Sequence, residues 1–164
     1  MPKHVSPSSH VITFSKCPWA ENDNQRKEYA TLFSHVEKDI PWARIALQQK
    51  PEAINLWIGN SLSTTALHKD NYENIYVQII GQKHFVLLPP VAYACVAEHD
   101  LVPASYKRSD GGELEMREEE GKKVPFATWD PDAEAENETS YSKYARPVRV
   151  TLEKGDMLYL PALW

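Results

Sequence analysis

Apolar and polar residues alternate over several short stretches of the chain, a pattern typical of β-strands whose two faces meet different surroundings. It predicts strands over residues 10–14, 54–59, 73–80, 83–88, 148–152 and 157–161. Gly81 and Gln82 stand alone between two of these stretches, so we expect residues 73–80 and 83–88 to pair as a hairpin.

Helical spacing of apolar residues is clearest in two segments. One covers about residues 25–38, and the other begins at Pro41, a residue that suits a first helical turn, and ends before Pro51. Polar, charged residues fill 111–120 and 130–147, which we interpret as exposed excursions. Many short strands with few helices indicate an α+β domain dominated by a sandwich or barrel, and the absence of a linker predicts one domain over residues 1–164.

Composition narrows the class of protein. The net charge of −5 argues against nucleic acid as an obligatory partner, because phosphate binding needs clustered Lys and Arg. Two cysteines, Cys17 and Cys95, are too few for a disulfide framework, so we interpret them as thiols in a reducing compartment. No apolar leader or membrane-length run is found. We therefore expect an intracellular protein, cytoplasmic or nuclear, without a membrane partner.

His68 and Asp70 lie just before the strand predicted at 73–80. Side chains alternate along an extended chain, so the two should project from the same side. A neutral imidazole and a carboxylate are two of the three ligands in a 2-His-1-carboxylate iron site. So short a motif also arises by chance, which leaves a surface or hydrogen-bonded pair as the alternative.

Three further residues could serve a carboxylate ligand. Lys83 opens a strand that also carries Phe85 and Leu87, where an ammonium is costly to bury unless it meets an anion such as a dicarboxylate co-substrate. Thr65 offers a hydroxyl, and Asn74 shares the parity of Asp70 and could donate to a carboxylate. The plainer alternatives are a lysine at an exposed turn and an ordinary amide at a loop edge.

Six stretches occur together and in one order, and as a set they are far more specific than any one of them. They are Asn55–Gly59, Thr65–Asp70, Tyr72–Asn74, Gly81–Phe85, Leu87–Pro90 and Gly155–Trp164. From about Pro41 to Trp164 the chain thereby resembles the JmjC branch of the cupin superfamily, and within it the lysyl hydroxylases. The resemblance implies a mainly β fold with flanking helices, the double-stranded β-helix or jelly roll.

The resemblance also implies a function, that of an oxygenase dependent on Fe(II), 2-oxoglutarate and O₂ that hydroxylates a protein side chain, in the first place a lysine. It implies that His68 and Asp70 bind the iron. It implies that Lys83 and Thr65 contact the distal carboxylate of 2-oxoglutarate and that Asn74 contacts its other end. A protein substrate is the expected partner, and a homodimer is an expectation for the full-length protein.

Two departures from the family pattern qualify these expectations. The third iron ligand of the family is a His two positions after a Leu-Pro-Ala-Leu-Trp segment, and this chain stops at Trp164. His84 is no substitute, because it should face away from Lys83. The family also has a Tyr on an early strand, where this chain offers Thr13 or Phe14. We therefore expect a truncated barrel with weak iron binding, and a non-catalytic cupin-like binding module is the alternative function.

Overall fold

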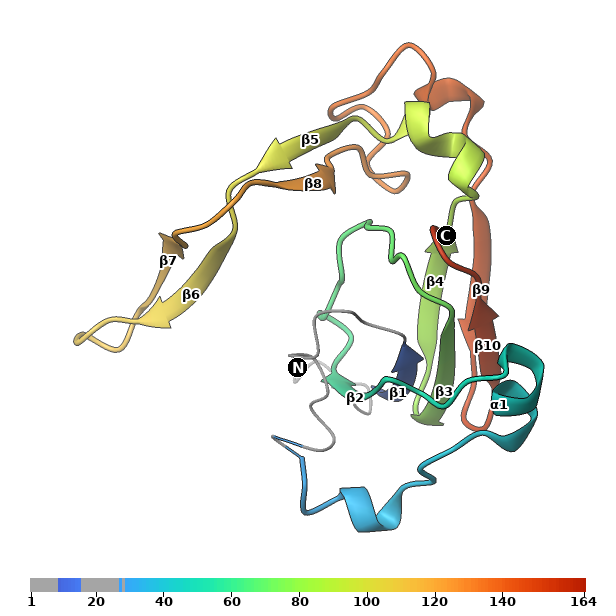
Figure 1. The fold of residues 1–164 in the computed structure, drawn as a ribbon. Coiled ribbons are helices and arrows are strands. Elements are labelled where there is room, and N and C mark those ends of the chain that lie inside the picture. Colours follow the sequence, from blue (N-terminus) through green and yellow to red (C-terminus); the bar gives the residue numbers. More distant parts are fainter. Residues whose placement is uncertain (1–8, 16–26, 28) are drawn as a thin grey trace, which may run out of the picture. The chain divides into compact units, whose positions relative to one another are not determined.

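Short strands make up most of the fold, as the alternating pattern predicts. The computed structural model describes residues 9–15, 27 and 29–164 (Figure 1). The strands are β1 (Ser9–Ser15), β2 (Ala53–Gly59), β3 (Asn74–Ile80), β4 (Lys83–Leu87), β5 (Glu98–Leu101), β6 (Ala104–Arg108), β7 (Leu114–Glu118), β8 (Val124–Ala127), β9 (Val148–Leu152) and β10 (Met157–Leu160). The helices are α1 (Pro41–Leu47) and the 3-10 turns η2 (Phe33–His35), η3 (Pro90–Cys95) and η4 (Ser142–Tyr144).

These elements divide into two compact units. The first contains the described residues of Met1–Thr65, Lys69–Leu88 and Pro147–Trp164, and the second contains Ala66–His68 and Pro89–Arg146.

The first unit is built on a four-stranded antiparallel sheet in the order β10-β3-β1-β2. Strand β4 pairs instead with β9, from Lys83 opposite Leu152 to Leu87 opposite Val148. All six predicted strands are thus present, and each bound lies within one residue of its predicted position.

The predicted hairpin between residues 73–80 and 83–88 is wrong, although both strands exist. Strand β3 has β1 on one edge and β10 on the other, so no edge remains for β4. The turn before β10 also occupies the edge of β3. The backbone amide of Gln78 donates to the carbonyl of Asp156, and the backbone carbonyl of Gln78 accepts from the amide of Gly155. Gly81, at φ 72°, allows the chain to leave the sheet and enter a second one, as strands of a double-sheet jelly roll do.

The core of the first unit lies between α1 and the sheet. Its buried residues are Ile40, Ala43, Ile54, Leu56 and Ile75, and Tyr29, Phe33 and Val36 pack against them. Pro41 occupies the first turn of α1, and Gln48 ends the helix in the left-handed conformation. In its described part, the helix predicted over 25–38 is only the turn η2. A helix of this length is marginally stable by itself, and Tyr29, Phe33 and Val36 reach the core without one.

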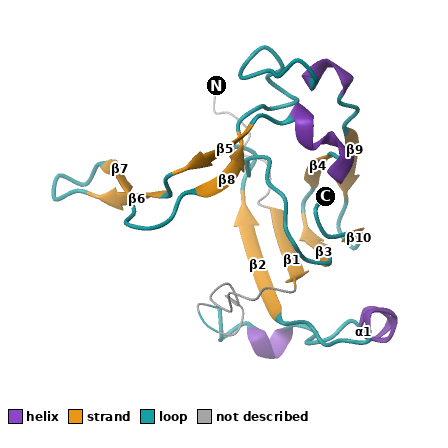
Figure 2. Cartoon of the chain, turned by 45° about the horizontal axis from the view of Figure 1, so that its top comes forward, coloured by secondary structure: helices purple, strands orange, loops and turns teal. Residues whose placement is uncertain are grey.

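The second unit is dominated by two antiparallel ribbons, β5–β8 and β6–β7, which follow one another along the same pair of chain segments (Figure 2). The excursion predicted at 111–120 is therefore partly a strand, β7, and it is exposed at every position. In the same unit, Ser142 Oγ donates to the carbonyl of Cys95 at 2.7 Å, which joins two segments far apart in the sequence. Cys95 is buried as a free thiol, whereas Cys17 lies outside the described residues.

None of the helices formed by the described residues is long and apolar enough to cross a membrane.

We predict that the core between α1 and the sheet carries much of the stability of the first unit. Ile54 is fully buried, so Ile54→Ala should lower the free energy of unfolding by about 2–5 kcal/mol. Ile45 on α1 is 68% exposed, and Ile45→Ala is the matched control, with an expected change within about 0.5 kcal/mol. Urea denaturation followed by circular dichroism measures both, and equal losses in the two variants would contradict this placement of the core.

Candidate functional site

Three aromatic rings surround the ammonium of Lys83 at the first residue of β4. Its Nζ lies 5.4 Å from the centroid of Phe85 and 6.0 Å from the centroids of both Tyr76 and Trp57. Tyr76 and Phe85 also contact each other edge to face, with centroids 4.9 Å apart. Ring faces attract a cation, so β2, β3 and β4 together form an aromatic enclosure that holds the ammonium in place.

The enclosure has a clear electrostatic consequence. Loss of solvent around the ammonium lowers the pKa of Lys83 below its ordinary value of 10.5. Among the described residues, no carboxylate forms an ion pair with Lys83. A half-buried cation without an anion costs free energy, and binding of an anion beside Lys83 would offset that cost.

Tyr76 complements this cation with a neutral hydroxyl. Burial, together with the negative charge of Asp70, raises its pKa to about 12. The hydroxyl therefore keeps its proton throughout the physiological range and can donate a hydrogen bond beside Lys83.

Asp70 is held from two directions. Its Oδ2 accepts a hydrogen bond from Asn74 Nδ2 at 3.1 Å, and its backbone carbonyl accepts one from the amide of Leu163 at 2.6 Å. Asn74 is only 1% exposed, and its Oδ1 is buried without a hydrogen-bond partner among the described residues. The side-chain amide of Asn74 therefore orients the carboxylate of Asp70, and its own Oδ1 is a hydrogen-bond acceptor still available beside that carboxylate.

His68 lies in the exposed loop before β3, where its Nδ1 lies 2.9 Å from the carbonyl of Ala66. With the proton on Nδ1 donated to that carbonyl, the lone pair lies on Nε2, the arrangement found in metal-binding histidines. His68 and Ala66 belong to the second unit and Asp70 to the first. The contacts of His68 and those of Asp70 are therefore described each within its own unit. The metal assignment of this pair stays a prediction.

The structure thus links several of the predicted residues. Asn74 contacts Asp70, the charge of Asp70 acts on Tyr76, and the ring of Tyr76 faces Lys83. Thr65 is exposed in the loop between β2 and β3, and its predicted contact with a co-substrate stays a prediction.

Sequence reasoning did not find the role of Trp57, which completes the aromatic enclosure. Strand alternation alone could not reveal it, because β2 and β4 belong to different sheets.

The donor chemistry of the described residues suits part of an iron site. An imidazole and a carboxylate are ligands that Fe(II) accepts, and a buried amide oxygen lies beside the carboxylate. No group of three or more His, Cys, Asp or Glu side chains able to hold a metal occurs within the described part of the chain. The assignment of His68 and Asp70 as two iron ligands therefore stays a prediction.

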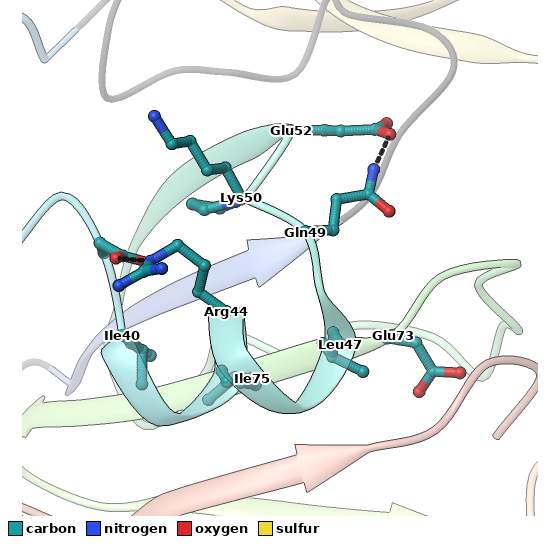
Figure 3. A pocket seen from close by; sticks show the side chains of 11 residues that line it. Ile40, Arg44, Leu47, Gln49, Lys50, Glu52, Glu73 and Ile75 are labelled. Atoms are coloured by element: carbon teal, nitrogen blue, oxygen red, sulfur yellow. Dashed lines mark hydrogen bonds and ion pairs between the residues drawn. The ribbon is translucent and has the colours of Figure 1, made fainter.

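A separate cavity of about 170 Å³ lies between α1 and β3 (Figure 3). Glu73 and Ile75 line it, and these alternate along the chain with Asn74 and Tyr76, so it opens on the other face of β3. Arg44 on its wall pairs with Asp39 at 2.6 Å. Its polar groups are largely committed to one another, and the cavity is distinct from the Lys83 enclosure.

The sequence of the chain is similar to those of known proteins. The family described as "Cupin-like domain" matches residues 6–164. The chain is 39% identical over 143 residues to the bifunctional peptidase and (3S)-lysyl hydroxylase JMJD7 of Homo sapiens, an alignment that covers 86% of this chain and 45% of that protein. It is also 39% identical over 154 residues to the lysine-specific demethylase JMJ32 of Arabidopsis thaliana, covering 88% of this chain and 44% of that protein. The chain spans less than half the length of these relatives.

We predict that the buried ammonium of Lys83 lowers the free energy of unfolding at pH 7. Its pKa is lower in the folded than in the unfolded state, so the unfolded chain binds more protons just below pH 10.5 and stability rises with pH there. Lys83→Met should therefore be more stable than the wild type at pH 7, and the difference should shrink as the pH approaches 10.5.

Thermal unfolding between pH 7 and pH 10.5 measures this difference. Lys143→Met is the control, because that lysine is exposed in η4. A Lys83→Met variant that is less stable than the wild type at pH 7 would show that the ammonium is already compensated in the folded protein.

Proposed function

This chain belongs to the cupin-like family, and on that premise we propose that it is part of an Fe(II)- and 2-oxoglutarate-dependent oxygenase that hydroxylates a lysine side chain of a protein. The names of both relatives reported above refer to lysine, one as a lysyl hydroxylase and the other as a lysine-specific demethylase. Lysine is therefore the substrate side chain that they have in common.

The observation that supports a 2-oxoglutarate site best is the enclosed ammonium of Lys83. A carboxylate of the co-substrate would supply the missing anion, and the neutral hydroxyl of Tyr76 would donate to the same group. The surrounding rings of Trp57 and Phe85 limit access of water, which strengthens the attraction between the two charges.

The iron would be held by His68 and Asp70. When bound, the metal supplies the chemistry of O₂ and of the oxidative decarboxylation of 2-oxoglutarate. The contribution of the protein is orientation. The carbonyl of Ala66 fixes the ring of His68 so that Nε2 can coordinate, and Asn74 fixes one oxygen of Asp70 and so the direction of the carboxylate.

Asn74 has a second role in this proposal. Its buried Oδ1 can accept a hydrogen bond, and its amide nitrogen lies against the carboxylate that would bind the metal. A co-substrate bound to the metal would lie beside this amide. Thr65 would add a hydroxyl to the carboxylate at Lys83, as the family resemblance implies.

The proposal predicts a specific pattern of lost activity in the full-length protein that contains this chain. With Fe(II), 2-oxoglutarate and a lysine-containing protein substrate, we expect succinate and a lysine that has gained one oxygen atom, both measured by mass spectrometry. His68→Ala should lower turnover by at least about 100-fold, more than the roughly 10- to 100-fold typical of groups that only orient a metal ligand. His99→Ala is the matched control, since His99 is another exposed histidine.

Lys83→Met should act differently in the same assay. Loss of one charged hydrogen bond should raise the KM for 2-oxoglutarate by about 10- to 100-fold, with a smaller effect on kcat. Full turnover in the His68→Ala variant would exclude the iron assignment. Binding of 2-oxoglutarate without any turnover in the wild type would instead favour the alternative, a cupin-like binding module.

A further inference from the structure

Gln78 on β3 is completely buried, at 0% exposed. Val77 and Ile79 pack toward the core at α1, so Gln78 lies on the opposite face of the strand, which is the face of Tyr76. Its two polar atoms have different surroundings. Nε2 donates to the backbone carbonyl of Ile80 at 2.8 Å, whereas Oε1 is buried without a hydrogen-bond partner among the described residues.

Stability does not account for this side chain. A buried amide with an unpaired oxygen costs free energy, and an apolar side chain of the same shape would avoid that cost. Ile80 is 46% exposed, so water could satisfy its carbonyl if the amide of Gln78 were absent. Proteins keep groups that cost stability chiefly where function requires a particular geometry.

The bond from Gln78 to Ile80 spans a β-bulge. His10 of β1 lies opposite Ile80, but the next residue, Val11, lies opposite Gln78, so Ile79 is an extra residue on β3. A bulge bends its strand and changes the direction in which the following chain runs. Because the side chain of Gln78 joins the residues on both sides of the bulge, it fixes that bend.

The bulge lies between Tyr76 and Lys83, the two groups of the candidate carboxylate site. After the bulge, Gly81 at φ 72° turns the chain out of the sheet, and Lys83 is the first residue of β4. Only Gly81 and Gln82 separate the bulged strand from Lys83. A change of direction at the bulge therefore moves the ammonium relative to the ring of Tyr76, whose centroid is 6.0 Å from it.

We propose that Gln78 is a positioning residue for Lys83. Its amide holds the bulge of β3 so that the ammonium stays among the aromatic rings and faces the carboxylate that binds there. Gln78 acts only through Lys83. That this carboxylate belongs to 2-oxoglutarate rests on the proposed function, whereas the placement of the ammonium by Gln78 does not.

The first test needs no co-substrate. In Gln78→Met the bulge loses its side-chain bond, so the ammonium of Lys83 should become more exposed to solvent. The lowered pKa of Lys83 should then return toward 10.5, as measured by NMR titration of its amine. Gln49→Met is the control, because it removes a similar bond elsewhere, that of Gln49 with Glu52 at 3.0 Å, and should leave this pKa unchanged.

The second test uses 2-oxoglutarate and the full-length protein that contains this chain. Gln78→Met should raise the KM for 2-oxoglutarate by about 3- to 10-fold, the range expected for one neutral hydrogen bond, with little change in kcat. In a Lys83→Met background the same substitution should have no further effect on KM, because Gln78 acts through the ammonium. A residue needed only for the fold would show no such dependence on Lys83.

Two measurements separate positioning from folding. The urea midpoint of Gln78→Met should equal or exceed that of the wild type, since the variant lacks the unpaired buried oxygen. Gln78→Asn keeps an amide but is one methylene too short to reach the carbonyl of Ile80. It should reproduce the changes in the Lys83 pKa and in KM, and it serves as the test variant if Gln78→Met folds poorly.

Three results would overturn the proposal. They are a Lys83 pKa that is unchanged in a folded Gln78 variant, effects of Gln78→Met and Lys83→Met on KM that multiply in the double variant, and a failure of both Gln78 variants to fold. A wild type that does not bind 2-oxoglutarate would instead contradict the proposed function, and the titration without co-substrate would still decide the role of Gln78.

Discussion

The burial of one positive charge is the constraint on which the candidate site depends. Lys83 opens β4, and its ammonium lies among the rings of Trp57, Tyr76 and Phe85, contributed by three different strands. An ammonium in such a place costs stability unless an anion arrives, and proteins keep costly groups chiefly where they bind or react. The enclosure therefore relates the fold to a carboxylate ligand more directly than any other feature of the described residues.

Strand β3 connects this charge to Asp70, one of the two residues proposed to bind the metal. Because both of its edges are paired, its side chains can only face the α1 core or the opposite side. Ile75 packs into the core, whereas Asn74 orients Asp70 and Tyr76 faces Lys83. The corner at Gly81 then sends β4 into a second sheet, which places Lys83 against the ring of Tyr76 and not in a hairpin beside it.

Local pattern was enough to predict the six strands of the first unit and the short helix at Pro41, because both depend on nearby residues. It failed for the pairing of residues 73–80 with 83–88, since the competition of β1 and β10 for the edges of β3 involves residues far away in the sequence. The role of Trp57 was missed for the same reason. His68, Asp70 and Lys83 were singled out from the sequence, and the family resemblance gave them their roles. What the structure adds is the surroundings of each: the Ala66 carbonyl, the Asn74 amide and the aromatic rings.

An NMR titration of the Lys83 amine tests most directly whether Lys83 binds a carboxylate of 2-oxoglutarate. The amine signal is assigned by its loss in a Lys83 variant, and the titration is run with and without 2-oxoglutarate, with zinc as a diamagnetic substitute for iron. A bound carboxylate favours the charged form of the amine. Binding should therefore raise the pKa of Lys83 from its lowered value back toward or above 10.5. A pKa of Lys83 that stays the same when 2-oxoglutarate binds would show that the co-substrate lies elsewhere and that Lys83 is not its partner.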